Sequence, residues 1–314
     1  MNLLSSMRYL VALNEHKHFG RAAHACHITQ PALSNALRAL ETEFNVAIVK
    51  RDRTFVGLTL EGERVLASAQ LMLREHALLQ QELKSENHIP SGPLRIAAVP
   101  TAVPILSRFA AMLQARHSGI APVVLSMSSS ALENGLADLS LDLALGYTER
   151  LVRPDNRLVA YPQYTEHYFL LRRAARPGTR GLVIGPKATW ADVAKLPLCL
   201  LTPDMHNRTI VDAALTTAGL SVRPAIETNS ILTMTLAVVA GSVSSVLPGA
   251  LVDAMRGFGE LEALPLSNPE VRTPIGFMTH TGPKPSRALE AALTLLQDGA
   301  WLRHAATHSG LLSA

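Results

Sequence analysis

The sequence predicts a mixed α/β protein with three successive parts: a small helical head, a long connecting helix, and a larger two-lobed α/β domain. Three observations predict this order. Helical apolar spacing fills the first 45 residues, a continuous helical pattern covers residues 60–84, and short apolar strands alternate with helices from residue 94. The 314 residues suffice for two or three cores. We place the head at residues 1–60, the connecting helix at 61–87, a hinge at 88–93, the two-lobed domain at 94–304 and a tail at 305–314.

Composition excludes a disordered chain and a membrane-spanning one. Apolar residues make up 48% and charged residues 17%, which is typical of a chain with a large core. No apolar run reaches the roughly 18 residues that a membrane helix needs, and residues 1–14 lack the pattern of an export signal. We therefore expect a cytoplasmic protein with no membrane partner. Cys26 and Cys199 lie far apart in sequence and are expected to be free thiols.

The basic excess lies mainly at the front of the chain. The net charge is +4, and the first sixty residues alone hold seven Lys/Arg against four Asp/Glu. A basic front favours an anionic partner, although many enzymes are equally basic.

Three helical patterns fill the head. The first covers about Leu3–Glu15, and the second, Phe19–Ala25, has small alanines that let another helix approach closely. After a turn at Cys26 and His27, Thr29 can cap a third helix with Pro31 in its first turn. Leucines at helical spacing supply the inner face of this third helix. The sequence predicts a helix-turn-helix.

The outer face of the third helix carries short or forked polar groups instead of the Lys/Glu mixture of a merely solvated helix. Asn and Gln can bond adenine in bidentate fashion, and Arg can bond guanine or phosphate. We expect this face to contact DNA through Thr29, Gln30, Pro31, Ser34, Asn35 and Arg38.

A basic hairpin is expected after the third helix. Val46–Val49 and Val56–Leu60 have the composition of short strands, and Lys50, Arg51 and Arg53 lie between them. Taken alone, these three basic residues would fit a solvated loop equally well. Beside a helix-turn-helix, a wing that contacts phosphates is favoured. The head is therefore predicted to be a winged helix-turn-helix.

The head resembles that of LysR-type transcription regulators over some sixty residues. The matching segments, in the family's order and spacing, are Phe19-Gly-Arg-Ala-Ala23, His27-Ile-Thr-Gln-Pro-Ala-Leu-Ser34, Leu40-Glu41 and Leu58-Thr-Leu-Glu-Gly62. In this family Gln30, Pro31, Ser34 and Arg38 fall at positions that meet DNA, and a basic residue is common where Asn35 stands here. The resemblance implies a regulator of double-stranded promoter DNA that pairs through its connecting helix, commonly forms homotetramers, and contacts RNA polymerase. It also implies an effector domain that is similar to a periplasmic binding protein.

Histidines cluster in the head, but a metal site is not expected. His24 and His27 lie three residues apart across a helix end, and no second coordinating cluster follows downstream. His27 also matches a histidine common in the family. We expect structural histidines, no metal and no cofactor.

The connecting helix carries a heptad seam. Val65, Ala69, Met72, His76, Leu79 and Leu83 recur at spacings of 4, 3, 4, 3 and 4. The helix could pack on its own domain, but pairing of two subunits is favoured, because paired heads suit palindromic DNA. Two prolines and a glycine in Glu86–Pro93 then end the helical pattern.

The rest of the chain alternates strands and helices, which argues for a parallel-rich sheet in two lobes. The expected strands are Leu94–Val99, Val123–Met127, Leu141–Gly146, Tyr168–Arg172, Leu198–Thr202, Val243–Leu247 and Ile275–Thr279. The expected helices are Val103–Arg116, Asn207–Ala218, Ile231–Ala240 and Ser286–Gln297. The resemblance implies two crossings between the lobes, which we place near Tyr161–Gln163 and Pro265–Pro269. Lobe I would then hold residues 94–162 and 267–304, and lobe II residues 163–266.

A small-molecule cleft is expected where strands end and helices begin, because free amide groups collect there. The residues at these strand ends are Thr101, Ala102, Ser128, Ser129, Thr202, Asn207, Arg208 and Asn229. Hydroxyl groups, amides and one guanidinium would suit a carboxylate or another small anion. Thr101 and Ser128 lead the set, because effector contacts in the family fall at these two strand ends. Ordinary helix caps use the same residue types.

Cys199 is expected to be structural. Some LysR-type regulators sense peroxide through a cysteine pair in the second lobe, whereas Cys199 lies in the apolar run Leu196–Leu201 and no other cysteine follows residue 26.

Two other function classes compete. An enzyme would need a catalytic motif, and no phosphate loop, nucleophile elbow or zinc-binding helix occurs. A solute-binding protein would need export, and a purely architectural DNA-binding protein would not need the large α/β part. The expected class is a non-enzymatic regulator. The tail Ser309–Ala314 is expected to be mobile.

Overall fold

The structure is a computed structural model that describes residues 2–51, 55–84, 89–151, 158–178, 181–281, 284–310 and 312. The chain divides into two compact units, residues 1–88 and 89–314. No helix in the described ranges is long and apolar enough to cross a membrane.

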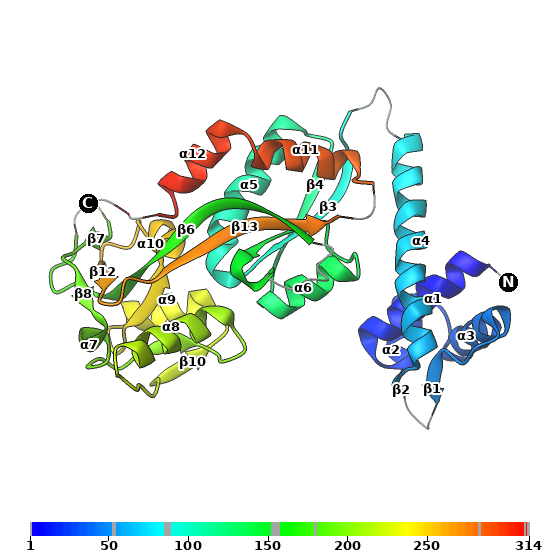
Figure 1. Cartoon of the computed structure of the whole chain (residues 1–314), viewed down its shortest axis with the longest axis horizontal. Coiled ribbons are helices and arrows are strands. Elements are labelled where there is room, and N and C mark those ends of the chain that lie inside the picture. Colours follow the sequence, from blue (N-terminus) through cyan, green and yellow to red (C-terminus); the bar gives the residue numbers. More distant parts are fainter. Residues whose placement is uncertain are drawn as a thin grey trace. The chain divides into compact units, whose positions relative to one another are not determined.

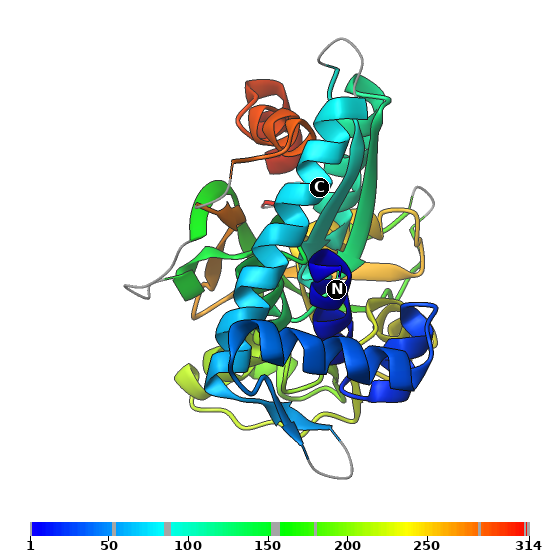
Figure 2. The same cartoon turned by 90° about the vertical axis from the view of Figure 1, so that its right-hand side faces the viewer.

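The first unit holds the three predicted helices, a hairpin and the connecting helix (Figures 1 and 2). Its elements are α1 (Leu3–His16), α2 (Phe19–Ala25), α3 (Gln30–Phe44), β1 (Val49–Arg51), β2 (Phe55–Leu58) and α4 (Leu60–Lys84). Leucines of α1 and α3 form a core with the paired alanines of α2. Because Ala22 and Ala23 are small and fully buried, α2 lies close to both neighbours.

One glycine fixes how α4 leaves this head. A Cβ added to Gly62 would lie only 2.1 Å from the carbonyl oxygen of Ile48. Thr59 holds the same junction, because its hydroxyl donates to the carbonyl of Ala47 and caps α4 by accepting from the amide of Gly62 at 2.9 Å.

The second unit is a two-lobed α/β domain built around one long sheet. Among its described residues, β4-β3-β5-β13-β6-β12-β7 is the strand order, with β11 also paired to β6 and β8 to β12. The strands are β3 (Gly92–Ala98), β4 (Ile120–Ser126), β5 (Leu143–Tyr147), β6 (Leu158–Arg173), β7 (Val183–Ile184), β8 (Ala188–Thr189), β11 (Ser245–Pro248), β12 (Leu261–Ser267) and β13 (Arg272–His280). A separate parallel pair joins β9 (Cys199–Leu201) and β10 (Ile226–Thr228).

Helices cover the sheet in each lobe. They are α5 (Val103–Arg116), α6 (Ser129–Ala137), α7 (Trp190–Val193), α8 (His206–Thr217), α9 (Ile231–Val239), α10 (Gly249–Ala254), α11 (Arg287–Leu296) and α12 (Gly299–Thr307), with short 3₁₀ turns η2 (Pro100–Ala102) and η3 (Thr148–Leu151). The lobe I core centres on Phe109, Phe277 and Trp301, and lobe II has a core on each side of its sheet.

The two antiparallel strands β6 and β13 run between the lobes (Figure 1). On β6, residues up to His167 pair with β13, and residues from Phe169 onward pair with β12. The sequence predicts only Tyr168–Arg172 as strand, because Pro162 and the polar residues after it interrupt the apolar pattern. The strand paired with β6 changes between His167 and Phe169. This point lies a few residues after Tyr161–Gln163, where the sequence predicted the crossing.

The end of the chain is packed, which corrects the expectation of a mobile tail. Ser309 is fully buried and its hydroxyl donates to the carbonyl of Ala305. Leu312 is buried in a core of lobe II. Residues 311, 313 and 314 lie outside the described residues. Two adjacent leucines give no periodic signal, so only tertiary contacts reveal this packing.

Candidate nucleic-acid interface and ligand cleft

The turn between α2 and α3 is held by backbone bonds and caps. His27 adopts a left-handed φ of 56°, and the amide of Ile28 donates to the carbonyl of Ala23 at 3.0 Å. The Thr29 hydroxyl accepts from the amide of Ala32, which starts α3 as predicted. His18 caps α2 through Nδ1, which gives this head histidine a structural role. These contacts place the two helices in helix-turn-helix geometry.

The predicted DNA-facing residues share the outer face of α3. Leu33, Leu37 and Leu40 are buried on the inner face. On the outer face Thr29, Gln30, Pro31, Asn35 and Arg38 are exposed, and Ser34 is partly exposed. The face therefore presents its donors and acceptors to solvent.

The hairpin is held against α3 by the carboxylate of Glu41, which the sequence analysis named only as part of the family resemblance and gave no role. Glu41 Oε1 accepts from the amides of Ile48 and Val49 at 3.0 and 3.1 Å. The hairpin pairs β1 with β2 in antiparallel register. Lys50 is exposed on it. Arg53 and the side chain of Arg51 lie outside the described residues.

The heptad seam of α4 is divided. Its first members lie against the head, since Ala69 is fully buried and α1 packs along α4. Farther along, Met72 is 46% exposed and Leu79 54% exposed. The side chain of Leu83 is outside the described residues. The apolar surface open to a partner is therefore the second half of the seam.

A small cleft lies between the lobes at the predicted strand ends. Its lining combines η2 and the start of α6 from lobe I with the start of α8 from lobe II: Val99, Pro100, Thr101, Ser128, Ser129, Tyr147, Leu201, Met205, His206 and Asn207. The cavity volume is about 10 Å³, which is room for about one water. A larger ligand therefore requires the lobes to separate.

Half of the predicted effector residues line this cleft, namely Thr101, Ser128, Ser129 and Asn207. Ala102 is buried in the lobe I core, and Asn229 is exposed and absent from the lining. Thr202 is absent from the lining too, although its Oγ1 is buried without a partner.

Arg208 does not serve the cleft, which corrects its predicted role as an anion ligand. Its guanidinium donates to both oxygens of Asp212 at 2.9 Å, to Glu227 at 2.6 Å and to the carbonyl of Leu201. Side chains on α8 one position apart point in different directions, so Asn207 faces the cleft and Arg208 faces β9 and β10.

Unpartnered polar atoms gather around the cleft. Ser129 Oγ and Asn207 Nδ2 are buried without a hydrogen-bond partner, and both residues line it. Asn207 is 5% exposed and Ser129 7% exposed. No side chain caps α8. Because buried polar atoms are normally paired, these donors indicate a place for a ligand or water.

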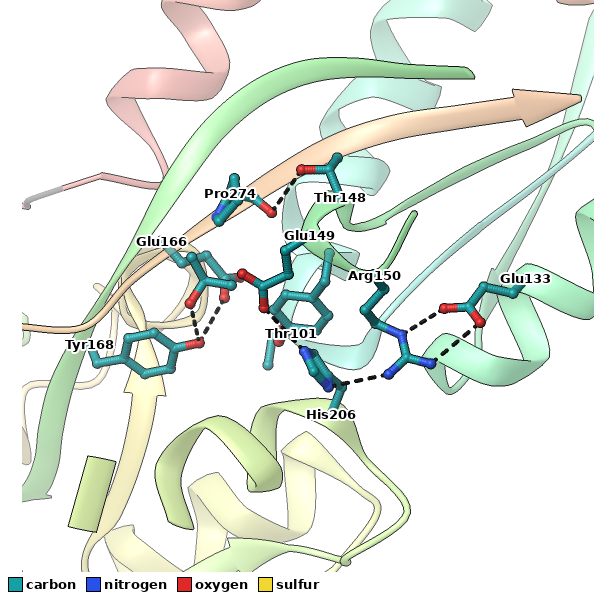
Figure 3. Close-up of polar contacts among 11 residues, drawn as sticks. Thr101, Glu133, Thr148, Glu149, Arg150, Glu166, Tyr168, His206 and Pro274 are labelled. Carbon is teal, nitrogen blue, oxygen red and sulfur yellow. Dashed lines mark hydrogen bonds and ion pairs between the residues drawn. The ribbon is translucent and has the colours of Figure 1, made fainter. Parts of the chain in front are cut away.

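A charged network crosses the cleft and was missed by the sequence reading (Figure 3). His206 Nε2 lies 3.2 Å from Glu149 Oε1, and its Nδ1 lies 3.5 Å from Arg150. Arg150 forms a bidentate pair with Glu133 of α6, with Nε–Oε1 at 2.6 Å. The three residues of lobe I thus meet a histidine of lobe II. Their only sequence signal is polarity, because η3 and α8 are far apart along the chain.

Glu166, on β6, is a fully buried carboxyl group beside this cleft (Figure 3). The hydroxyl of Tyr168 donates to its Oε2 at 3.3 Å, and its Oε1 has no partner. Burial raises the pKa of Glu166 to about 8, against the lowering effect of its hydrogen bond from Tyr168. Thr101 lies between Glu166 and the cleft, with its Oγ1 3.0 Å from the hydroxyl of Tyr147.

Cys199 lies in β9 and is fully buried. Burial raises the pKa of its thiol, which keeps it protonated and unreactive.

A helix-turn-helix head, a long connecting helix and a two-lobed α/β domain with a cleft between its lobes define a ligand-responsive transcription regulator. Two family models match the chain: "Bacterial regulatory helix-turn-helix protein, lysR family" over residues 4–63 and "LysR substrate binding domain" over residues 87–301. The chain therefore belongs to the LysR family of transcription regulators, and it is a regulator, not an enzyme.

Curated relatives and solved structures agree with this assignment. The "DNA-binding transcriptional dual regulator OxyR" of Escherichia coli K12 is 29% identical over 280 residues, which cover 89% of this chain and 90% of the relative. The "SDS degradation transcriptional activation protein" of a Pseudomonas strain is 31% identical over 63% of this chain and 64% of its own length. The fold matches "Full-length OxyR C199D from pseudomonas aeruginosa", with a TM-score of 0.65, 24% identity and coverage of 93% and 96% of the two chains. It also matches the CbnR–target DNA complex, with a TM-score of 0.62, 18% identity and coverage of 96% and 99%.

Proposed function

We propose that this regulator contacts promoter DNA through the outer face of α3 and the basic hairpin. Thr29, Gln30, Pro31, Ser34, Asn35 and Arg38 supply the face, and Lys50, Arg51 and Arg53 supply cations for the backbone. The exposure of the α3 set, against the buried leucines behind it, supports this assignment.

We infer that a small effector with a carboxylate or another anionic group binds in the inter-lobe cleft. The observation that carries this is the pair of buried, unpartnered donors Ser129 Oγ and Asn207 Nδ2, which face a cavity at the uncapped start of α8. Thr101 and Ser128 complete the set. Arg208 is left out because its guanidinium is already paired.

Assembly is proposed to follow the second half of the α4 seam. Met72 and Leu79 are apolar and exposed, so a second copy of this helix would bury them. A homodimer would place two heads on one palindromic site, and a homotetramer and contact with RNA polymerase would follow from the family's usual mode of action.

Peroxide sensing by a cysteine pair is not proposed, although relatives include a "Hydrogen peroxide-inducible genes activator". The two cysteines are Cys26 in the head and Cys199 in the effector domain, so the effector domain cannot form a disulfide within itself.

The test is binding of the purified full-length chain to its own upstream intergenic fragment, titrated with salt and with a panel of small carboxylates. Specific binding that one carboxylate modulates is the expected result. Thr101→Val should leave DNA binding intact and blunt the ligand response, whereas Thr294→Val, on the exposed face of α11, should change neither. Loss of the ligand response in both variants, or salt-labile binding without sequence preference, would contradict the proposal.

A further inference from the structure

The charges around the cleft are already paired, or they are negative. None of its lining residues is Lys or Arg. Arg150 is held by Glu133, and Arg208 by Asp212 and Glu227. Among the described residues, an anionic group in the cleft would therefore meet neutral donors, helix amides and His206, whose Nε2 lies 3.2 Å from Glu149, but no Lys or Arg without a carboxylate partner.

Behind Thr101 lies a buried acidic and aromatic cluster that the proposed anion does not use. Glu166 Oε1 and the hydroxyl of Tyr164 are both buried without a hydrogen-bond partner. The titratable groups facing Glu166 are Tyr147 from β5, Tyr164 and Tyr168 from β6, and Glu149 from η3. None of these groups is a cation. A buried carboxylate without a counter-charge is costly, which is why Glu166 keeps its proton.

The cleft and the cluster around Glu166 would bind groups of opposite charge on one ligand. The cleft side presents unpartnered donors at Ser129 and Asn207, and the Glu166 side presents an unpartnered carboxyl oxygen and a tyrosine hydroxyl. An ammonium group has three N–H donors and a positive charge. It can therefore serve both Glu166 and Tyr164 while the surrounding tyrosine rings favour a cation.

We propose that the effector is a small zwitterion of the amino-acid class, with its carboxylate at Ser129, Asn207 and the start of α8 and its ammonium group on Glu166. This inference rests on the proposed function of the cleft. When the ligand binds, Glu166 loses its proton to the buffer and the resulting carboxylate pairs with the ammonium group. The lobes separate to admit the ligand, since the closed cavity holds about one water.

The experiment is calorimetric titration of the full-length protein at pH 7 with each of the twenty protein amino acids, in two buffers of different ionisation enthalpy. For each amino acid that binds, two analogues follow: one lacks the amino group, and the other carries a hydroxyl in its place. We expect at least one amino acid to bind, both analogues to bind at least tenfold more weakly, and nearly one proton to be released per ligand.

Variants separate the two ends of the ligand. Glu166→Gln should weaken amino-acid binding at least tenfold and abolish proton release, whereas Glu290→Gln, an exposed carboxylate on α11, should behave as wild type. Tyr164→Phe removes only the unpartnered hydroxyl. If Glu166→Gln does not fold, weaker amino-acid binding by Tyr164→Phe tests the same end of the ligand. Ser129→Ala should weaken amino acids and simple carboxylates alike.

Three outcomes would overturn the inference: no amino acid binds, the hydroxy analogue binds equally well, or Glu166→Gln binds unchanged. If simple carboxylates bind and only Ser129→Ala weakens them, the ammonium half is wrong and the proposed function stands. If ligands bind but Ser129→Ala and Thr101→Val have no effect on any of them, the cleft assignment itself fails.

Discussion

His308 Nδ1 lies 2.7 Å from Asp253 Oδ2, so the residue that follows α12 is fastened to α10 of lobe II. The same carboxylate accepts from Arg108 of α5 at 3.0 Å and from Arg256 at 2.6 Å. Asp253 is 3% exposed, whereas its three partners are partly exposed. One buried carboxylate therefore joins lobe I, lobe II and the end of the chain.

Asp253→Asn should lower the free energy of unfolding by about 1–3 kcal/mol, because several charge-assisted hydrogen bonds weaken together. The cost stays moderate because Arg108, Arg256 and His308, which lose their charged partner, are partly exposed and can bond to water. Arg256→Ala should cost less than about 1 kcal/mol, since that side chain is largely solvated. Urea unfolding of both variants checks this, and equal losses would show that Asp253 does not hold the network.

Arg38→Ala should weaken DNA binding by about 1–3 kcal/mol, because its guanidinium lies on the exposed face of α3. Fluorescence anisotropy with a labelled promoter fragment at several salt concentrations measures the change. Arg303→Ala, an exposed arginine on α12, is the matched control and should bind normally. Unchanged affinity of Arg38→Ala at every salt concentration would remove this residue from the interface.

Leu79→Asp should shift the protein from dimer toward monomer, because it places a charge in the exposed half of the α4 seam. Sedimentation velocity at micromolar concentration gives the oligomeric state. Gln80→Asp adds the same charge to the neighbouring exposed position and should leave assembly unchanged. A dimer that survives Leu79→Asp would place the pairing surface elsewhere.

Glu166 should make stability depend on pH. Its folded pKa of about 8 lies above the 4.5 that is ordinary for a glutamate side chain, so between these values the folded state holds a proton that the unfolded state releases. The stability of the wild type therefore falls as pH rises from about 4.5 to 8. Glu166→Gln has no carboxyl group to titrate, so its stability should not show this fall with pH.

Relative to wild type, Glu166→Gln should gain about 2–4 kcal/mol between pH 5 and pH 8, by the linkage of pKa to stability. Denaturant unfolding at both pH values measures the difference, in which the remaining titrating groups largely cancel. A constant difference would mean that Glu166 is ionised in the folded protein.

Hydrogen peroxide should leave DNA binding unchanged, because Cys199 is a buried protonated thiol. Electrophoretic mobility shifts before and after peroxide treatment test this, with thiols counted in the wild type and in Cys199→Ala to show whether Cys199 or Cys26 reacted. Cys199→Ala should regulate as wild type does. A peroxide response that Cys199→Ala abolishes would give this residue a redox role.

Local patterns account for what the sequence predicted well. The helices of the head carry their own caps and apolar spacing, as at Thr29 and Thr59, so their limits follow from neighbouring residues. Strands β3, β5 and β13 contain short apolar runs, which are visible without a structure. Thr101, Ser128, Ser129 and Asn207, which line the cleft, were predicted because each follows a strand end where a helix starts.

Long-range contacts decided the rest. Sequence determined that a helix starts near Asn207, but only packing turned Asn207 toward the cleft and Arg208 toward Glu227. Glu166 was missed because its neighbours in the sequence give no sign that it is buried among tyrosines from two strands. The packing of Leu312 depends on a core whose other residues, from Phe169 to Ala263, lie far from it in the sequence. Caps and periodicity act over a few residues, whereas burial and pairing depend on which distant segments the fold brings together, and only the tertiary structure supplies that.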